Sequence, residues 1–94
     1  HITGGGLEEN LTRAVPHTLS VVIKRDAWEM PKLFKKIQKL GNISSNEMLK
    51  VFNCGVGFCL IADKDVSNQI IAESNEIIQI GNIQKNMNER FLIK

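Results

Sequence analysis

Apolar residues recur along the chain at two spacings, one typical of helices and one typical of strands. Leu7, Leu11 and Val15 follow one another in four-residue steps, which places them on one face of a short helix. Pro16 ends that helix because proline cannot continue the helical hydrogen bonds. Residues 19–23 instead predict a strand, with the apolar side chains of Leu19, Val21 and Ile23 on one face.

A second amphipathic helix is predicted to begin at Pro31, because proline suits the first position of a helix. Its closing left-handed position is assigned to Gly41, which has no side chain to clash. The lysines of this segment form the solvated face of the helix. The expected apolar stripe consists of Leu33, Phe34, Ile37 and Leu40.

Two further helices are indicated by capping signals. Ser44 and Glu47 are spaced as in a capping box, which predicts a short helix over about residues 46–52. Asp63 or Asp65 is placed to cap a fourth helix. The apolar stripe of that helix is expected to contain Val66, Ile70 and Ile71.

The remaining apolar runs predict strands. Residues 58–62 form an apolar run of strand length, and residues 77–83 form a second one that is interrupted at Gly81. A turn over residues 86–88 then leads to an edge strand over residues 91–93. Helices and strands alternate, so the predicted class is α/β (α+β), a sandwich of helices packed on a sheet that looks incomplete.

Composition narrows the possible functions. The chain has 94 residues, of which 43% are apolar and 23% charged, which fits one small globular domain. No apolar run approaches the roughly 20 residues of a membrane-spanning helix, so no membrane association is expected. The net charge of +2 is too weak to predict nucleic-acid binding. Cys54 and Cys59 are expected to be reduced thiols in a cytoplasmic protein, and no zinc-ligand spacing is present.

The strongest chemical signal is the glycine-rich segment that opens the chain. Gly4, Gly5 and Gly6 precede a helix, where backbone N–H groups can converge on a phosphate. Thr3 adds a hydroxyl that can donate to a phosphate oxygen, and His1 adds a possible acid, base or hydrogen-bonding group. The alternative is a plain tight turn. Two acidic residues in the first turn of the helix, Glu8 and Glu9, would repel an anion unless they point away.

A second small-residue segment, residues 53–57, offers another candidate. The amide of Asn53 can donate and accept, and Gly55 permits close approach of a ligand or of another chain segment. The alternative is a glycine bulge. Cys54 has no visible base beside it, so no catalytic nucleophile is assigned. Arg13 can bind a phosphate or pair with an acidic residue four positions earlier.

Taken in order, these motifs resemble those of one enzyme family, aminoimidazole ribonucleotide (AIR) synthetase, also called phosphoribosylformylglycinamidine cyclo-ligase. The resemblance runs from residue 1 to about residue 83. The motifs that carry it are HITGGG at residues 1–6, Glu9-Asn10 with Arg13, Trp28 with Pro31, Gly41-Asn42-Ile43, Glu47-Met48, Phe52 to Gly57, and Ile80-Gly81.

The resemblance implies that the chain is the second half of the family's C-terminal domain, with a layered α/β/α fold of partly ferredoxin-like topology. The strand that precedes the glycine-rich loop would then lie before residue 1. An absent N-terminal domain would carry most of the residues for ATP and Mg²⁺ and would build a homodimer, so the isolated chain is expected to be inactive.

The implied reaction consumes ATP and formylglycinamidine ribonucleotide and yields aminoimidazole ribonucleotide, ADP and phosphate. The resemblance places Gly4 to Gly6 at the cleft that faces the substrate or nucleotide phosphates, with Asn53 and Gly55 on a neighbouring wall. His1 and Thr3 are added to this candidate site because of their side-chain chemistry. It assigns no catalytic base. Two alternatives stay open: a stand-alone module that binds a phosphorylated metabolite, and a related enzyme such as selenophosphate synthetase.

Overall fold

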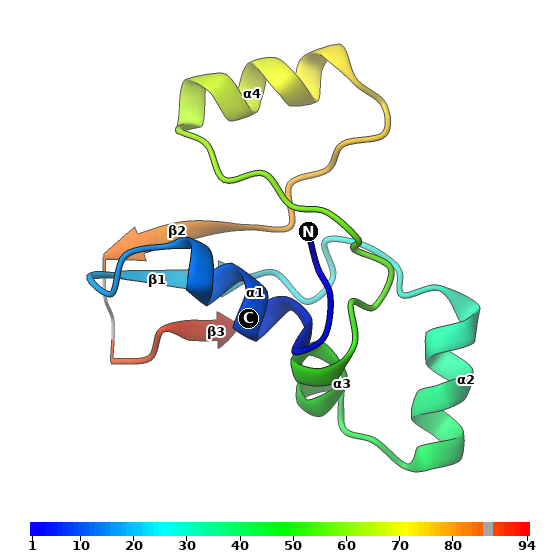
Figure 1. The fold of residues 1–94 in the computed structure, drawn as a ribbon. Coiled ribbons are helices and arrows are strands. Elements are labelled where there is room, and N and C mark those ends of the chain that lie inside the picture. The colour runs from blue at the N-terminus through cyan, green and yellow to red at the C-terminus, as the bar shows by residue number, and fades with distance from the viewer. Residues whose placement is uncertain (86–87) are drawn as a thin grey trace.

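The computed structural model describes residues 1–85 and 88–94, which form helices and a small sheet (Figure 1). The class is α+β, as the alternation of patterns predicted. In chain order the elements are α1 (Gly6–Ala14), β1 (Leu19–Ile23), α2 (Lys32–Gly41), α3 (Ser45–Val51), α4 (Lys64–Glu73), β2 (Gly81–Lys85) and β3 (Phe91–Ile93). Among the described residues, no helix is long and apolar enough to cross a membrane.

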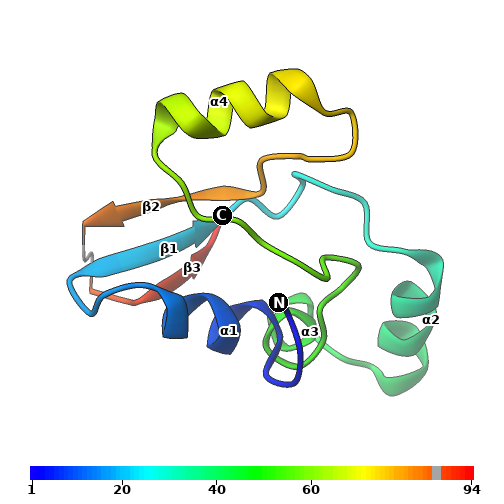
Figure 2. The ribbon, with the colours of Figure 1, turned by 45° about the horizontal axis from the view of Figure 1, so that its top comes forward.

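The sheet is mixed, and β1 is its central strand. The strand order is β2-β1-β3, with β2 antiparallel and β3 parallel to β1. Ile23 is opposite Gly81 in one pair and Ile93 in the other. Figure 2 shows α1 on one side of the sheet and α4 on the other. The central position of β1 accounts for its uniformly apolar second half, since its side chains are covered on both faces.

The core lies between α1, α3 and β1. The predicted helical stripe Leu7, Leu11 and Val15 is buried there, each side chain being at most 8% exposed. Met48 of α3 and Ile23 of β1 pack against it. Burial of this stripe explains why a helix with only nine residues is stable in its place.

Local capping signals predicted the helix ends well. The Ser44 hydroxyl accepts a hydrogen bond from the backbone N–H of Glu47, with 3.1 Å between Oγ and N. Asp63, rather than Asp65, caps α4 by accepting from the N–H of Val66 at 2.9 Å. The closing residue of α2 differs from the prediction. Gly41 is the last helical residue, and Asn42 takes the left-handed position with φ 51°, which asparagine tolerates better than most residues.

The predicted strand over residues 58–62 does not form. Its apolar side chains Phe58 and Leu60 are 67% and 64% exposed. The apolar run is present, but a strand also needs a neighbour to receive its backbone hydrogen bonds, and no described strand pairs with this segment. The later run also differs, since only its second part is paired: β2 begins at Gly81, where an interruption was expected.

Gly81 is the start of β2 because it lies directly against the backbone of β1. A side chain at this position would meet the carbonyl oxygen of Val22. The edge strand β3 is confirmed at the predicted residues, and it pairs in parallel with β1. The expected turn over residues 86–88 lies partly outside the described residues.

The peripheral helices α2 and α4 contain no buried residue. Half of the predicted apolar stripe of α2 is exposed: Leu33 is 64% exposed and Leu40 is 79% exposed. Phe34 of the same stripe instead packs edge-on against Phe52, with 6.1 Å between the ring centres. In α4, Val66 is 45% exposed. Amphipathic spacing thus predicted these helices correctly but did not reveal whether their apolar faces are covered.

Arg90 joins the end of α1 to the sheet. Its Nη2 lies 3.1 Å from the carbonyl oxygen of Thr12, 3.0 Å from that of Val15 and 3.1 Å from that of Pro16. Its Nε lies 3.4 Å from the carbonyl oxygen of Leu19. Carbonyls at the end of a helix lack helical partners, and a guanidinium supplies several donors in one plane.

We expect Arg90→Ala to lower the free energy of unfolding by about 2 kcal/mol, because charge-assisted hydrogen bonds to otherwise unpaired carbonyls are lost. Arg90→Lys should lose most of the same stability, since an ammonium cannot span the four oxygens. Urea unfolding of both variants measures the effect. Equal stability of Arg90→Lys and the unsubstituted chain would show that only the positive charge matters.

Candidate functional site

The glycine-rich loop turns sharply into α1, and two of its residues have backbone angles that favour glycine. Gly5 precedes the helix with φ 95°, and Gly6 begins it with φ 63°. No side chain caps this helix end. The N–H of Gly6 donates to the carbonyl of Thr3 at 3.1 Å, which closes the turn. The loop therefore combines the conformation of a tight turn with an uncapped helix N-terminus.

At Gly6 the end of α3 leaves no space for a side chain. A β-carbon at this position would lie 2.5 Å from the carbonyl oxygen of Leu49 and 2.8 Å from that of Phe52. Gly4 is the opposite case, since no atom would lie within 4 Å of a β-carbon there. The three glycines thus have different roles: Gly6 permits close packing against the protein, while Gly4 faces open space.

The two glycine-containing segments predicted from the sequence lie next to each other. The N–H of Ile2 donates to the carbonyl of Gly57 at 2.9 Å, and the ring of His1 lies 6.4 Å from that of Phe58. His1 and Thr3 are exposed, whereas Ile2 is buried and anchors the segment. The structure therefore brings the loop of residues 3–6 beside residues 52–57.

Asn53 and Gly55 contact their own chain. The side-chain oxygen of Asn53 accepts from the N–H of Gly55 at 2.9 Å and closes a small turn. Gly55 has φ 96°, and a β-carbon there would lie 2.6 Å from the ring of Pro31. Gly55 thus permits the close approach of another chain segment, which is one of the interpretations considered for this residue. The carbonyl of Cys54 accepts from the indole N–H of Trp28 at 3.0 Å, so Trp28 anchors this turn.

Cys54 is fully buried with φ 53°, and its thiol donates to the carbonyl of Met48 at 3.4 Å. Burial raises the pKa of Cys54, because an apolar surrounding disfavours the charged thiolate. The neutral thiol is a weak nucleophile. These surroundings support the sequence-based view that Cys54 is not a nucleophile. Both cysteines are free thiols.

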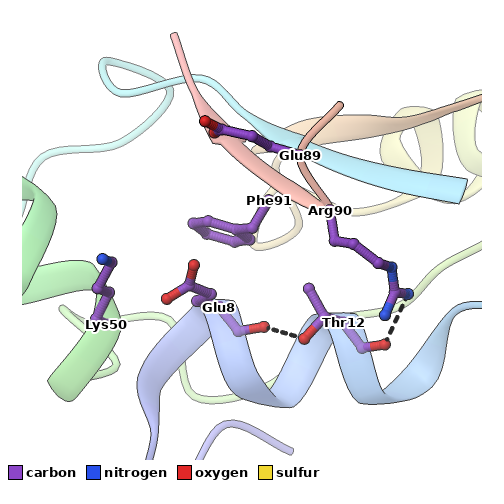
Figure 3. A pocket seen from close by; sticks show the side chains of 6 residues that line it. All are labelled: Glu8, Thr12, Lys50, Glu89, Arg90 and Phe91. Atoms are coloured by element: carbon purple, nitrogen blue, oxygen red, sulfur yellow. Dashed lines mark hydrogen bonds between the residues drawn. The ribbon is translucent and has the colours of Figure 1, made fainter. Parts of the chain in front are cut away.

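The charges near the loop are divided between two sides of α1. Glu9 folds back over the loop, so that a β-carbon on Gly5 would collide with its carboxylate. Arg13 pairs with Glu9 at 3.3 Å, which is the pairing alternative considered for this arginine. Glu8 points elsewhere, into a hollow of about 560 Å³ between α1 and β3 (Figure 3). Of these two glutamates, only Glu9 therefore competes with an anion at the loop.

The hollow in Figure 3 contains none of the residues predicted to bind substrate. Its walls carry mixed charges and one aromatic ring; the lining residues are Glu8, Thr12, Lys50, Glu89, Arg90 and Phe91. A larger groove of about 940 Å³ runs between α4 and the sheet and is mainly apolar. Within the described residues, no three His, Cys, Asp or Glu side chains converge as metal ligands.

Asn10 is the residue at this site whose function was not assigned from the sequence. Its Nδ2 donates to the carbonyl oxygens of Gly6 at 2.8 Å and of Thr3 and Gly4 at 3.2 Å each. The Thr3 hydroxyl, expected to face a phosphate, donates instead to Oδ1 of Asn10 at 3.4 Å. An asparagine one turn after a glycine-rich helix start was the available signal, because residues four apart share a helix face.

Comparison with known proteins identifies the protein family to which this chain belongs. The model of the AIR synthase related protein family, C-terminal domain, matches residues 1–94. The chain belongs to this family, as its motifs predicted.

Three relatives, each named phosphoribosylformylglycinamidine cyclo-ligase, illustrate the similarity. The protein from Staphylococcus aureus (strain Newman) is 48% identical over 90 residues, which are 92% of this chain and 26% of the relative. The protein from Pseudothermotoga lettingae is 46% identical over 79 residues, 84% of this chain and 23% of the relative. The protein from Citrifermentans bemidjiense is 48% identical over 71 residues, 76% of this chain and 20% of the relative. The chain thus spans about a fifth to a quarter of these relatives.

Proposed function

We propose that this chain is the second half of the C-terminal domain of a phosphoribosylformylglycinamidine cyclo-ligase. Such an enzyme uses ATP to close formylglycinamidine ribonucleotide into aminoimidazole ribonucleotide in purine biosynthesis. Relatives with that name align with most of the chain, which supports the proposal. The parent enzyme is proposed to be a cytoplasmic homo-oligomer, with ATP and Mg²⁺ bound mainly by its other residues.

Within that enzyme, the loop of residues 3–6 is proposed to bind a phosphate group of a substrate. The observation that carries this assignment is the open space beside Gly4 next to an uncapped helix N-terminus. Backbone N–H groups there attract an anion through their partial positive charge. Glu9 opposes this attraction, so its carboxylate must turn further toward Arg13 when the anion binds.

Other predicted residues would contribute less directly. His1 is exposed beside the loop and is free of the core, so it can reach a substrate hydroxyl. Thr3 would contact substrate through its hydroxyl oxygen, whose proton is directed to Asn10. Asn53 and Gly55 would shape the adjacent wall, because their turn is closed within the chain.

In the proposed reaction, the γ-phosphoryl group of ATP is transferred to the formamide oxygen of the substrate, and ADP leaves. A nitrogen of the substrate then attacks the activated carbon, the C–O bond breaks, and phosphate departs with that oxygen. This chain would hold a substrate phosphate in a fixed position during both steps, which favours catalysis by orientation. No residue of the chain is assigned as the acid or base.

ADP release that depends on formylglycinamidine ribonucleotide tests the proposal. The full-length protein should release ADP only when this ribonucleotide is present. The 94-residue chain assayed alongside should release none, since the proposal assigns most ATP-binding residues to the rest of the enzyme. No release by a folded full-length protein would favour a related enzyme such as selenophosphate synthetase. Release by the 94-residue chain would refute its assignment as a partial domain.

A further inference from the structure

Exposed apolar side chains gather along the groove between α4 and the sheet. Two segments of its wall carry them, and each of these side chains is between 39% and 67% exposed; they belong to Phe58, Leu60, Ile61, Ile77 and Ile78. Single apolar side chains on a surface are common, whereas several that line one hollow are typical of a surface that another segment covers.

The backbone of residues 58–62 offers hydrogen bonds that this groove leaves open. None of its N–H groups donates to a carbonyl oxygen of another described residue. Its side chains alternate as in a strand, since Cys59 packs against the core while its neighbours Phe58 and Leu60 are exposed. An unpaired strand of this kind is a template on which another extended segment can dock.

The residues that open the chain lie along the start of this segment (Figure 1). The N–H of Ile2 donates to the carbonyl of Gly57 at 2.9 Å, and the ring of His1 lies 6.4 Å from that of Phe58. Burial raises the pKa of the Cys59 thiol, and the amino group of His1 lowers it again in part, so this amino group lies near Cys59. Contacts thus advance from Gly57 to Cys59 as the other segment runs backward, which is the antiparallel direction.

We propose that, in the full-length enzyme, the residues that immediately precede His1 dock as an antiparallel strand on residues 58–62 and cover the apolar groove. The inference rests on the proposed function, in which most of the enzyme precedes this chain. Backbone hydrogen bonds hold the docked strand, and the exposed side chains of the groove select apolar residues at every second position of it.

The register of the docked strand follows from the same contacts. His1 is opposite Phe58, so the residue two positions before His1 is opposite Leu60, with both side chains on the same face. Because the carbonyl of Gly57 already accepts from Ile2, the N–H groups two and four residues later point at the docked strand as well. A slip by one residue would turn every side chain of the docked strand to the other face.

A disulfide in the full-length enzyme tests the docking and its register. In a Cys59→Ala background, Leu60→Cys is combined with a cysteine in place of the residue two positions before His1. Residues opposite each other in such a pair have Cα atoms about 4.5 Å apart, which a disulfide can span. Mild oxidation should remove both introduced thiols, and peptide mapping should find them linked within one chain. Cys54 is buried and does not compete.

The matched control moves the partner cysteine by one residue, to the position directly before His1. The number of thiols and their distance along the chain are nearly the same, but this side chain points to the opposite face of the docked strand. Both thiols of the control should therefore stay free under the same oxidation. In the enzyme without substitutions, amide hydrogen exchange should be slow at Cys59 and Ile61, whose N–H groups would donate to the docked strand.

Three results would overturn the inference. One is free thiols in the first variant, or a link in the control alone. Another is a link between two chains in an enzyme with only Leu60→Cys and Cys59→Ala, which would identify a second copy as the occupant. The third applies even when no variant folds: fast exchange at Cys59 and Ile61 in the unsubstituted enzyme. None of these measurements needs turnover, so a linked enzyme that fails to release ADP would contradict only the proposed function.

Discussion

Gly6→Ala is expected to lower the free energy of unfolding by roughly 3 kcal/mol, the combined effect of a strained backbone and an overpacked contact. The residue has φ 63°, which only glycine adopts without cost. A methyl group there would also lie 2.5 Å from the carbonyl oxygen of Leu49 and 2.9 Å from the carbonyl carbon of Lys50. Both atoms belong to the backbone of α3, so they cannot move away as a flexible side chain would.

Gly4→Ala is the matched control for this prediction. The same methyl group enters open space at Gly4, where nothing lies within 4 Å. Its stability should equal or slightly exceed that of the unsubstituted chain, because alanine restricts the unfolded state. Urea unfolding of the 94-residue chain, followed by fluorescence of its single tryptophan, Trp28, measures both. Equal midpoints for Gly6→Ala and Gly4→Ala would contradict the close packing of α1 on α3.

Gly4→Val is expected to lower kcat/KM of the full-length enzyme on the order of 100-fold while leaving its unfolding midpoint nearly unchanged. The open space beside Gly4 is the place proposed for the phosphate. A branched side chain would occupy that space and prevent close approach of the anion to the backbone N–H groups. The variant therefore separates binding from folding, which Gly6→Ala cannot do.

Ala72→Val serves as the control for the activity measurement. Ala72 is exposed on α4, so the added carbon atoms again meet solvent, but they are remote from the loop. Steady-state kinetics of ADP release should be unaffected. If Gly4→Val were fully active with both substrates, the loop would be a structural turn, and the phosphate would have to bind elsewhere.

Gly6→Ala and Gly4→Val address the two interpretations left open by the glycine-rich motif. A tight turn and a phosphate-binding loop both require glycine, but at different residues. The turn requires it where the backbone is left-handed and crowded, as at Gly6. A binding loop requires it where a ligand must reach the backbone, as proposed for Gly4. Consecutive glycines satisfy both needs, so their number alone could not separate them.

Features that depend on neighbours in the sequence could be predicted from the sequence. The helix caps at Ser44 and Asp63 depend on atoms three residues apart. The strand of residues 19–23 follows from apolar residues at every second position of a short segment. The buried stripe of α1 follows from its four-residue spacing. The family could also be recognised, because its motifs are short and occur in a fixed order.

Features that depend on distant residues were decided only by the tertiary structure. The apolar run of residues 58–62 has the length of a strand, but no described strand pairs with it. Arg90 reaches carbonyls more than 70 positions earlier, which no local pattern encodes. Periodicity states which side chains prefer burial, whereas the folded chain decides whether anything covers them. The same holds at the loop, where the sequence determined the three glycines and only the fold placed α3 against Gly6 and left the space at Gly4 open.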